Sequence, residues 1–585
     1  MRTITTLISI FFLFAFQLTK AQDVEIVPRG ALSDVEGNFA EKIGTTETFS
    51  NVNSIKFSSN AVNVSFKDKD DKTFKASTID KISLSGKVNK LPLFYPSSID
   101  SLLNYETSPS DTFLLPEAPA QPVVNSADPS YPDFQENFIW KNKIYISYSG
   151  SSVNIVGDTA KITFTSDGAH LSALSSRDSV EYILSGTSTN GSFQLTTDKP
   201  SKLLLSGLTL TDENGPVITS TNAGRTYIVT KDSTVNSLSD RANYSSTTFN
   251  SVISASGRLL LSGQGNLNIA ANHLNGITSS NFVRILGGLV QISVMAEGGN
   301  AIYTTDSTIL SGGTVRILAL GNAAKGIYST KQIHTTGGQT DIITKGDGEQ
   351  ADDQLADKAA EALFANDIIT VDGGTLRIKT VGGIGAVGLA CMKQIVINAG
   401  TIIASCYDDA FNAVNGISVN GGEIFLTSAV DDGIDTNGSL SIKGGTLFVI
   451  SPARAESPFD NDGKTFAITG GTIIGMGLKT DKPQTSVTKQ PTLCLTGINS
   501  DSYIRIQKST GEEILSFATP SYPSMTVLIS SPKLLLNTAY EVYTARTQKA
   551  GTEHFGVLSN PDFANYTLIA SFSMSSNVTT VSCNN

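Results

Sequence analysis

Two acidic doublets in the later half of the sequence carry the clearest chemical signal. Asp408–Asp409 recurs as Asp431–Asp432 within a repeated phrase that also contains paired glycines and alternating apolar residues. If successive repeats stack, several carboxylates meet in one small volume, and their repulsion must be relieved by raised pKa values or by a bound cation. The residues that we predict to form such a metal site are Asp408, Asp409, Asp431, Asp432, Asp435, Asn437, Asp460 and Asp462.

The donor atoms of this group indicate which cation it would take. Carboxylate and amide oxygens suit Ca²⁺, which accepts six to eight oxygen ligands in loose geometry, and no His or Cys is placed to favour zinc. The alternative is that Asp and Asn are ordinary turn residues here. Because the acids coincide from one repeat to the next, we predict Ca²⁺ as the cofactor.

The elements that position these acids follow from the repeat itself. Glycine pairs, or an Ala-Gly equivalent, recur at steps of 22 to 26 residues, with one longer step that contains an acidic, Ala-rich insertion at 348–360. A ladder of apolar residues, including Ile277, Ile302 and Ile327, keeps nearly the same period. A period in the twenties with short strand-like runs and no helical pattern indicates a parallel β-helix. The phrase typical of leucine-rich repeats is missing.

We therefore predict an all-β chain built on a right-handed parallel β-helix (solenoid), with a small N-terminal β module and a C-terminal β cap. Prolines concentrate between the module and the repeats, which predicts an extended linker or strap. The predicted organisation is a signal peptide at 1–21, the module at 22–90, the Pro-rich segment at 91–136, the β-helix at 137–477 and the cap at 478–585.

The N-terminus and the overall composition restrict location and partners. Arg2, an apolar run to Phe16 and small residues at Thr19 and Ala21 predict a secretory signal peptide cut near Ala21, because a membrane anchor needs about 20 apolar residues. We thus expect a secreted, periplasmic or cell-surface protein without membrane insertion. A formal charge of −11 argues against nucleic acid as a partner. The four cysteines fit no zinc or redox spacing, and the oligomeric state stays open.

One further column of the repeat is aromatic. The residue after the inward apolar position is Tyr303, then Tyr328, then Phe364. Strand alternation turns this column outward, where stacked rings would form a flat platform for sugar rings. The alternative is that the insertion or the Pro-rich segment covers the rings.

The same sequence gives little support for catalysis. A calcium-dependent lyase needs a basic residue beside the cation to remove a proton from the sugar, whereas Arg316, Arg377 and Lys379 lie coils away from the acids. A carboxylate pair would also suit a glycosidase, but these doublets recur with the repeat, as structural ligands do. We predict no catalytic residue.

Several phrases resemble the bacterial carbohydrate-binding domain family with a polysaccharide-lyase-like β-helix. The resemblance extends from about residue 137 into the C-terminal strands. The D-G-I-D-x-N-G and D-N-D-G phrases are its more specific parts. It is carried by Tyr182–Leu195, Leu203–Ile218, Asp431–Leu447 and Pro458–Ile473.

The resemblance implies a secreted or surface β-helix that binds plant-type polysaccharide such as cellulose or pectin and holds calcium. In earlier coils, where the family tends to repeat Asp-Gly-Ile, this chain has Asn275, Asn300, Lys325 and Glu361. Calcium is therefore expected only in the last coils. The acids that the resemblance assigns to calcium are Asp409, Asp432, Asp435, Asp460 and Asp462.

Together these observations predict a secreted, non-catalytic polysaccharide-binding protein with calcium held between late coils. Two alternatives stay open: a calcium-dependent lyase of the pectate type, and a structural or adhesion protein without a sugar ligand.

Overall fold

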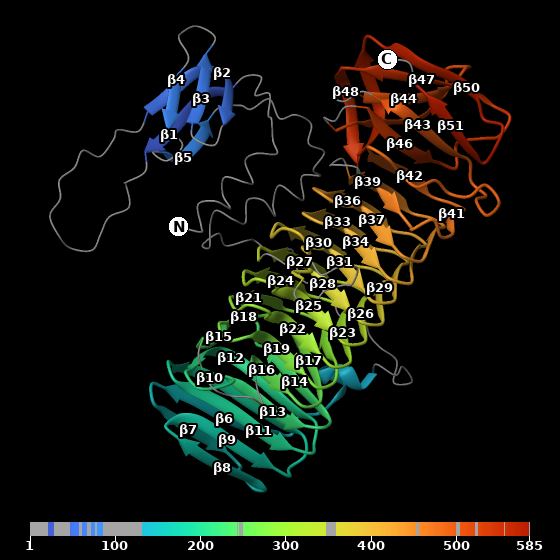
Figure 1. The fold of residues 1–585 in the computed structure, drawn as a ribbon. Helices are drawn as coiled ribbons and strands as arrows, with labels where there is room; N and C mark the ends of the chain where they lie inside the picture. Colours follow the sequence, from blue (N-terminus) through green and yellow to red (C-terminus); the bar gives the residue numbers. More distant parts are fainter. Residues whose placement is uncertain are drawn as a thin grey trace. The chain divides into compact units, whose positions relative to one another are not determined.

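The computed structural model describes residues 131–583, except 243, 245–249, 347–358, 452–455, 499–502, 521–523 and 555, together with five strands between residues 21 and 85 (Figure 1). Most of the expected signal peptide, the Pro-rich segment up to residue 130 and most of the acidic insertion lie outside the described residues. The chain divides into two compact units, Met1–Leu93 and Phe94–Asn585.

The first unit contains one antiparallel sheet, in the strand order β4-β3-β2-β1-β5. Alternating runs such as A-V-N-V-S-F form its strands, as such alternation predicts. The strands are β1 (Ala21–Pro28), β2 (Glu47–Phe57), β3 (Ala61–Phe66), β4 (Lys72–Lys75) and β5 (Ile79–Ser85).

The second unit is a parallel β-solenoid of about 11 turns followed by a C-terminal antiparallel cap. Each regular turn contributes one strand to each of three parallel ladders, here called A, B and C in chain order. Ladder A consists of β9 (Ala169–Ser175), β11 (Gly191–Thr197), β13 (Ile218–Asn222), β16 (Ser251–Ala255), β19 (Asn275–Ser279), β22 (Asn300–Thr304), β25 (Lys325–Ser329), β28 (Leu363–Ala365), β31 (Leu389–Cys391), β34 (Phe411–Ala413), β37 (Ile434–Thr436) and β40 (Phe459–Asp460).

Ladder B follows ladder A within each turn, and ladder C completes the turn. Ladder B consists of β14 (Arg225–Thr230), β17 (Arg258–Gly263), β20 (Val283–Ile285), β23 (Ser307–Leu310), β26 (Gln332–Thr335), β29 (Ile368–Val371), β32 (Gln394–Ile397), β35 (Gly416–Val419), β38 (Ser439–Ile442) and β41 (Phe466–Ile468). Ladder C consists of β15 (Val235–Asp240), β18 (Asn266–Ala271), β21 (Leu289–Val294), β24 (Thr314–Ala319), β27 (Gln339–Thr344), β30 (Thr375–Thr380), β33 (Thr401–Cys406), β36 (Glu423–Ser428), β39 (Thr446–Ser451) and β42 (Thr472–Gly477).

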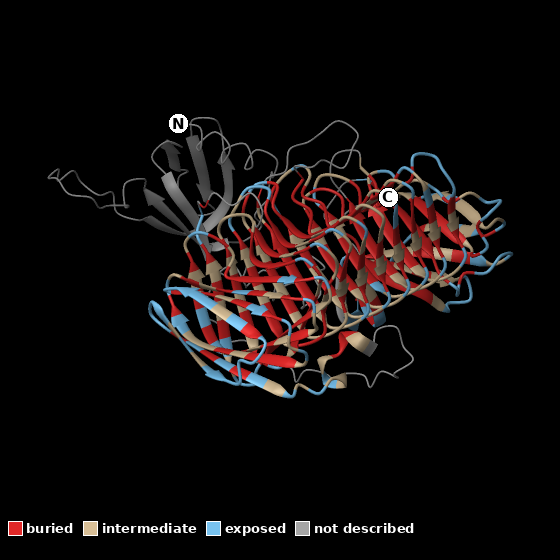
Figure 2. Cartoon of the chain, turned by 90° about the horizontal axis from the view of Figure 1, so that it is seen from below, coloured by how far each residue is buried: buried red, intermediate tan, exposed pale blue. Residues whose placement is uncertain are grey.

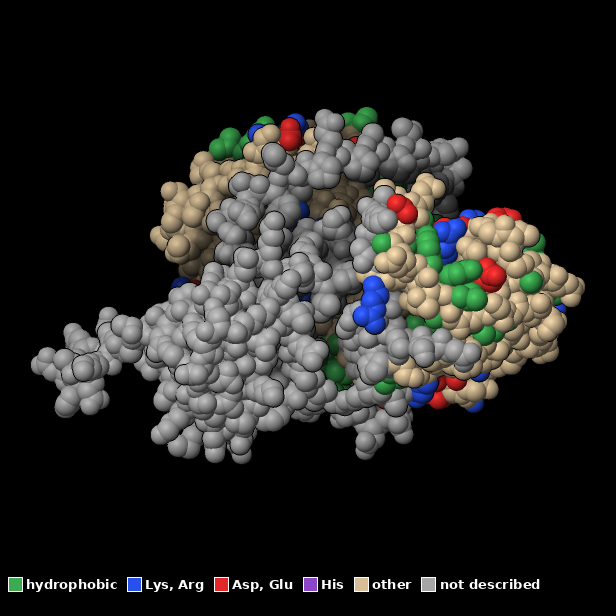
Figure 3. Space-filling model, turned by 90° about the horizontal axis from the view of Figure 1, so that it is seen from above, with side chains coloured by type: hydrophobic (Ala, Val, Ile, Leu, Met, Phe, Trp, Pro, Cys, Tyr) green, Lys and Arg blue, Asp and Glu red, His purple; other side chains and the backbone are tan. Residues whose placement is uncertain are grey.

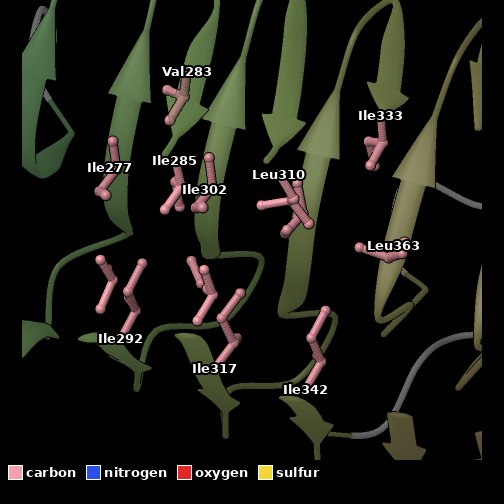
Figure 4. Packing of buried hydrophobic residues seen from close by; sticks show 14 of the residues in the cluster. Ile277, Val283, Ile285, Ile292, Ile302, Leu310, Ile317, Ile333, Ile342 and Leu363 are labelled. Atoms are coloured by element: carbon pink, nitrogen blue, oxygen red, sulfur yellow. The ribbon is translucent and has the colours of Figure 1, made fainter. Parts of the chain in front are cut away.

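The apolar ladder of the sequence fills the bore of the solenoid. Ile277 of ladder A, Ile285 of ladder B and Ile292 of ladder C point inward in one turn, and their equivalents stack above them (Figure 4). The inner residues are buried along the whole solenoid, and residues of intermediate burial alternate with them on many strands (Figure 2). This is the period-two pattern of strands that bury one face.

The glycine pairs form the turn between ladders B and C. The second glycine of each pair has a positive φ, for example 70° at Gly313 and 75° at Gly338. At Gly313 a Cβ would also lie 2.6 Å from the carbonyl oxygen of Gly288 in the previous turn. Glycine recurs at this position because the turn is left-handed and the stacked backbones are close.

The solenoid begins with antiparallel hairpins that the sequence pattern did not separate from the coils. β7 (Ser152–Gly157) pairs with β6 (Asn142–Ser149), and β8 (Ile162–Asp167) pairs with β9. Parallel pairing then runs from β6 through β10 (Val180–Ser188) to β12 (Ser201–Asp212), which pairs with both β14 and β15.

Two 3-10 turns precede these hairpins and lie against the outside of ladder B. They are η3 (Tyr131–Asp133) and η4 (Gln135–Asn137). The buried Asp133 carboxylate pairs with Arg225 at 3.1 Å and with Arg284 at 3.0 Å. Phe134 packs in the same cluster with Tyr227, so this segment is fixed by both charge and apolar contacts.

The cap contains two layers that cover the last coils, one with mixed strand pairing and one antiparallel. One layer continues the solenoid sheet through β46 (Met525–Ser530), β43 (Thr492–Ile498) and β51 (Val578–Ser582). The other has the order β48 (Thr547–His554), β49 (Val557–Ala564), β45 (Glu513–Ala518), β44 (Tyr503–Lys508), β47 (Ala539–Ala545) and β50 (Thr567–Ser573). The predicted all-β solenoid with N-terminal strands and a C-terminal β cap is confirmed.

Candidate metal centre

The acidic doublets lie in the turns that lead from ladder C into ladder A. Asp408 and Asp409 precede β34, and Asp431 and Asp432 precede β37. β34 and β37 are paired in parallel with Phe411 opposite Ile434, so the two turns stack in adjacent coils, about 4.8 Å apart. Asp408, Asp409 and Asp432 are buried, with exposed fractions of 7%, 7% and 6%. The fold therefore removes most water from around these carboxylates.

Within the described residues, two groups of carboxylates are close enough to share a cation. Asp408, Asp409 and Asp431 form one group, and Asp431, Asp432 and Glu456 form the other, with ligand atoms within 4.8 Å of one another in each. Asp431 belongs to both groups. Glu456 was missed in the sequence, although it directly precedes Ser457 in the next coil as Asp431 precedes Asp432.

Backbone hydrogen bonds from the following coil hold two of these carboxylates. The amide of Asp432 donates to Oδ1 of Asp409 at 2.9 Å, and the amide of Ser457 donates to Oδ1 of Asp432 at 2.6 Å. Oδ2 of Asp408 accepts the amide of Gly385 at 2.5 Å. The carboxylates of Asp408, Asp409 and Asp432 are thus oriented by the backbone.

Without a cation, this cluster is electrostatically unfavourable for ionised acids. Burial, followed by the charges of Asp460, Asp431 and Asp435, raises the pKa of Asp432 to about 8. Burial and the neighbouring acids also raise the pKa of Asp409 well above its usual value. Desolvation and repulsion both favour protons on these groups. A divalent cation relieves both effects at once.

The donor set fits a hard cation. Both groups contain only carboxylates, which are the ligands that Ca²⁺ prefers. Burial raises the pKa of the nearby Cys406 thiol to about 12, and the charges of Asp409 and Asp408 act in the same direction. Cys406 therefore stays a neutral thiol near neutral pH and offers no thiolate to a soft metal.

The remaining predicted ligands lie further out, on ladder A and just beyond it, and belong to neither group of carboxylates. Asp435 on β37 is paired with Asp460 on β40. Asn412 links this outer column to the turn, since its Nδ2 donates to Oδ2 of Asp409 at 2.7 Å and to Oδ2 of Asp435 at 3.0 Å. Burial and nearby acids, chiefly Asp460 and Asp462, raise the pKa of Asp435 to about 7.

Asn437 and Asp462 contact each other instead of the buried groups. Nδ2 of Asn437 donates to Oδ2 of Asp462 at 3.0 Å. Asp462 has a φ of 51°, and its amide donates to Oδ1 of Asp460 at 3.1 Å. This pattern is that of an Asx turn, which was the alternative interpretation of these residues.

Earlier coils fill the same turn position with groups that neutralise one another. Lys325 and Glu361 are buried and form an ion pair of 3.0 Å, with side chains 5% and 0% exposed. One and two coils earlier, the amide of Asn300 donates to Oδ1 of Asn275 at 2.8 Å. The ammonium of Lys325 occupies a position where the later coils gather acids. The cluster of carboxylates is therefore confined to the last coils.

The aromatic column has the predicted register but not the predicted surface. Tyr303 pairs with Tyr328, and Tyr328 with Phe364, in adjacent strands of ladder A. The rings are inclined by 66° and 54°, and Phe364 is only 6% exposed because Val387 and Met392 pack against it. The expectation of a flat, exposed platform is wrong. The column presents two half-buried tyrosines beside a buried phenylalanine.

The basic residues considered for catalysis lie on the outer face of ladder C. Arg316, Asp341 and Arg377 occupy consecutive strands in register. The guanidinium of Arg377 donates to Asp341, with Nε 2.6 Å from Oδ1, and Arg316 lies 3.7 Å from the same carboxylate. These arginines neutralise a buried acid and do not lie in the turns that carry the acidic doublets.

Comparison with known proteins gives one family for this solenoid. Residues 158–433 match the family described as carbohydrate-binding domain-containing protein. The matched segment covers a little under half of the 585 residues and ends at the second acidic doublet. The family resemblance noted in the sequence is confirmed. Glu456 and the C-terminal cap lie outside the matched segment.

One solved structure also matches part of this chain. It is titled "Structure of the polysaccharide lyase-like protein from C. thermocellum, Gadolinium derivative", with a TM-score of 0.32 and 18% identity, covering 51% of this chain and 96% of that chain. Comparison with curated proteins gave no match. In the described part of the chain, none of the helices is long and apolar enough to span a membrane.

Proposed function

We propose that this chain is a secreted, non-catalytic protein that binds polysaccharide through its solenoid and holds Ca²⁺ between the last coils. The observation that carries the proposal is the pair of buried carboxylate groups that share Asp431. They lie in the turns that lead into later strands of ladder A, the same ladder whose strands β22, β25 and β28 carry the aromatic column. Support for the ligand class comes from the carbohydrate-binding family match over residues 158–433.

In this proposal the cation stabilises the last coils and sets the charge of the ladder A surface that lies beyond the aromatic column. Asp408, Asp409, Asp431, Asp432 and Glu456 would hold it. Bound Ca²⁺ supplies positive charge that offsets the carboxylate repulsion. The outer acids Asp435 and Asp460 then lie on the same face of ladder A as Tyr328, so one ligand can contact both.

Tyr303 and Tyr328 are the side chains that we assign to sugar contact. Their half-buried rings keep an apolar edge at the surface, and their hydroxyl groups supply hydrogen bonding. Phe364 supports Tyr328 from the next coil, with ring centroids 5.0 Å apart. A ligand that lies along ladder A passes from this column towards the acidic coils.

A sedimentation assay with insoluble cellulose, xylan and pectin tests this function. We expect the wild-type protein to bind at least one of these polysaccharides, and Tyr328→Ala to weaken that binding. Tyr145→Ala serves as the matched control, because Tyr145 lies on β6 and is 50% exposed. Equal binding by wild type and Tyr328→Ala would contradict the assignment.

The alternative activity is a calcium-dependent lyase, and a direct assay separates it from binding. A lyase acting on polygalacturonate would release unsaturated sugars with a new ultraviolet absorbance. We expect no such product in the presence of Ca²⁺, because Arg316 and Arg377 already pair with Asp341 on another ladder. Sustained product formation would replace our proposal. Absence of binding to every glycan would favour the structural or adhesion role instead.

We also propose that the protein acts outside the cytoplasm. The basis is the N-terminal sequence, in which Arg2 precedes an apolar run and small residues lead to Ala21. Mass spectrometry of the protein recovered from its native cells would find a mature N-terminus near Gln22. An intact N-terminus beginning at Met1 would contradict export by this route.

A further inference from the structure

The outer layer of the C-terminal cap carries a second group of aromatic and polar side chains. β44 and β47 are antiparallel neighbours, with Arg505 opposite Tyr543 and Gln507 opposite Glu541. The residues between them, such as Ile506, point inward to the apolar core of the cap. Alternation therefore places the four polar and aromatic side chains together on the outer face of this sheet.

Mutual hydrogen bonds hold these side chains in place. The carboxylate of Glu541 accepts hydrogen bonds from Gln507 at 3.2 Å and from the hydroxyl of Tyr543 at 2.8 Å. Arg505 donates to the hydroxyl of Tyr566 at 2.8 Å, and its guanidinium lies 5.4 Å from the centre of that ring. The rings of Tyr543 and Tyr566 meet edge to face, with centroids 6.0 Å apart. Side chains fixed in this way lose little freedom when a ligand binds.

The group remains accessible. Tyr566 is 41% exposed, its neighbour Leu568 is 49% exposed, and Arg505, Gln507, Glu541 and Tyr543 are half-buried. In Figure 3 the C-terminal cap, on the right, shows hydrophobic, basic and acidic side chains side by side. We call the surface formed by Arg505, Gln507, Glu541, Tyr543 and Tyr566 the cap face.

We propose that the cap face is a second polysaccharide-binding surface, separate from the solenoid and independent of Ca²⁺. A sugar ring offers apolar C–H groups to the tyrosines, while its hydroxyl groups find donors in Arg505 and Gln507 and an acceptor in Glu541. Surfaces that combine aromatic side chains with a few fixed polar groups are typical of ligand sites. The inference relies on the proposed function only for the class of ligand, since the cap lies outside residues 158–433.

Charge argues against other classes of partner. Arg505 is the basic member of the cap face, and its Nε lies 3.5 Å from the carboxylate of Glu513. A face whose cation is balanced by Glu513 and Glu541 has little attraction for phosphate, so nucleic acid and acidic lipid are unfavourable ligands. A neutral ligand rich in hydroxyl groups matches this surface best.

The test is a binding comparison between variants of the two surfaces in the full chain. Wild type, Tyr543→Ala/Tyr566→Ala, Tyr328→Ala and the control Tyr145→Ala are titrated with soluble fragments of cellulose, xylan and pectin, in Ca²⁺ and in EDTA. We expect the cap variant to lose about tenfold in affinity for one glycan in both conditions, as the removal of aromatic anchors does elsewhere. Circular dichroism and the calcium dependence of melting confirm that each variant is folded.

The outcomes separate this inference from the proposed function. Affinity that falls in the cap variant in both Ca²⁺ and EDTA, and falls separately in Tyr328→Ala, supports the cap face together with the proposed function. Affinity that falls in Tyr328→Ala and is unchanged in the folded cap variant overturns the cap face and leaves the proposed function intact. Binding lost only in the cap variant overturns the role of ladder A instead. Self-association that is abolished by the cap variant, with glycan binding unchanged, would identify the face as a dimer contact and refute the inference. No binding by wild type refutes both.

Discussion

The substitution Asp432→Asn provides a sharp prediction, because it removes one charge from the acidic cluster and keeps the shape of the side chain. Asparagine retains the Oδ1 atom that accepts the amide of Ser457. In the cation-free protein, the raised pKa of Asp432 means that the folded state holds a proton which the unfolded state releases. The stability associated with this proton is complete below about pH 4 and is lost as the pH rises towards 8.

The size of this effect follows from the pKa difference. The pKa of Asp432 is raised from 3.8 to about 8. At pH 7 the difference amounts to at most about 4 kcal/mol, at 1.36 kcal/mol for each pKa unit between 3.8 and 7. In EDTA the melting temperature of wild type should fall between pH 5 and pH 8, by up to about 10 °C. The melting temperature of Asp432→Asn should fall less over this pH range, and at pH 8 it should be higher than that of wild type.

In the same assay, Ca²⁺ should reverse the order of the two melting temperatures, so that wild type melts above Asp432→Asn. A ligand that binds only the folded state at a hundred times its Kd adds about 2.7 kcal/mol to stability. Wild type should therefore gain melting temperature from Ca²⁺, and gain more at pH 8 than at pH 5, because protons compete with the cation. Asp432→Asn should gain much less at either pH.

Thermal melting from pH 5 to pH 8, in EDTA and in Ca²⁺, measures both effects. Asp198→Asn is the matched control, since Asp198 has a side chain that is 73% exposed and lies outside the acidic cluster. The reasoning is refuted if wild type and Asp432→Asn have the same pH dependence in EDTA and the same response to Ca²⁺.

Three further predictions concern the parts of the fold that surround the site. Lys325→Met should lower the free energy of unfolding by about 3–5 kcal/mol, because it leaves the buried Glu361 carboxylate without its ion-pair partner. The double variant Lys325→Met/Glu361→Leu should recover most of that loss. Denaturant unfolding of both variants measures this, and a double variant as unstable as the single one would contradict it. Phe448→Ala should lower the free energy of unfolding by about 3–5 kcal/mol, because the buried ring stacks on Phe425 beneath the cap. Limited proteolysis should then release cap fragments earlier than in wild type. An unchanged cleavage pattern would count against this contact. Asp133→Asn should destabilise the chain by about 3 kcal/mol, because it deprives Arg225 and Arg284 of a buried carboxylate. The increase in melting temperature caused by Ca²⁺ should be the same as in wild type. Melting with and without Ca²⁺ measures this, and a changed calcium response would contradict it.

The solenoid could be predicted from the sequence because its period is imposed by backbone geometry. A left-handed turn at Gly313 and an inward Ile277 recur in every coil for reasons that neighbouring coils do not alter. The antiparallel hairpin of β6 and β7 was not anticipated, since its alternation is the same as that of a coil strand. Pairing direction depends on the partner strand and not on the strand's own sequence.

The sequence contains a pattern that predicts where the cap packs on the solenoid, and our sequence analysis did not use it. The outer face of ladder C changes from Arg377 to Ile403, Phe425, Phe448 and Ile474 in consecutive coils. Exposed apolar residues in register on one face require a cover. The cap supplies this cover, because its Phe517 and Val527 pack in the same cluster.

The candidate site was predicted in part. The stacked doublets follow from the repeat, but Glu456 was missed because the next coil has Ser457 in place of a second acid. The flat aromatic platform failed for a different reason. Phe364 is covered by Val387 and Met392 of the following coil, and the inclination of the rings depends on that packing, which a residue pattern does not specify.

The most direct test of the account is calcium titration calorimetry on EDTA-treated wild type and Asp431→Asn. Asp431 is the carboxylate common to both groups, so its neutralisation should weaken every site in the cluster. We predict saturable calcium binding by wild type and a loss of at least about tenfold in affinity for Asp431→Asn, in line with the effect of losing a metal-site partner. The same stoichiometry and affinity in both proteins would contradict the central claim that the last coils hold calcium.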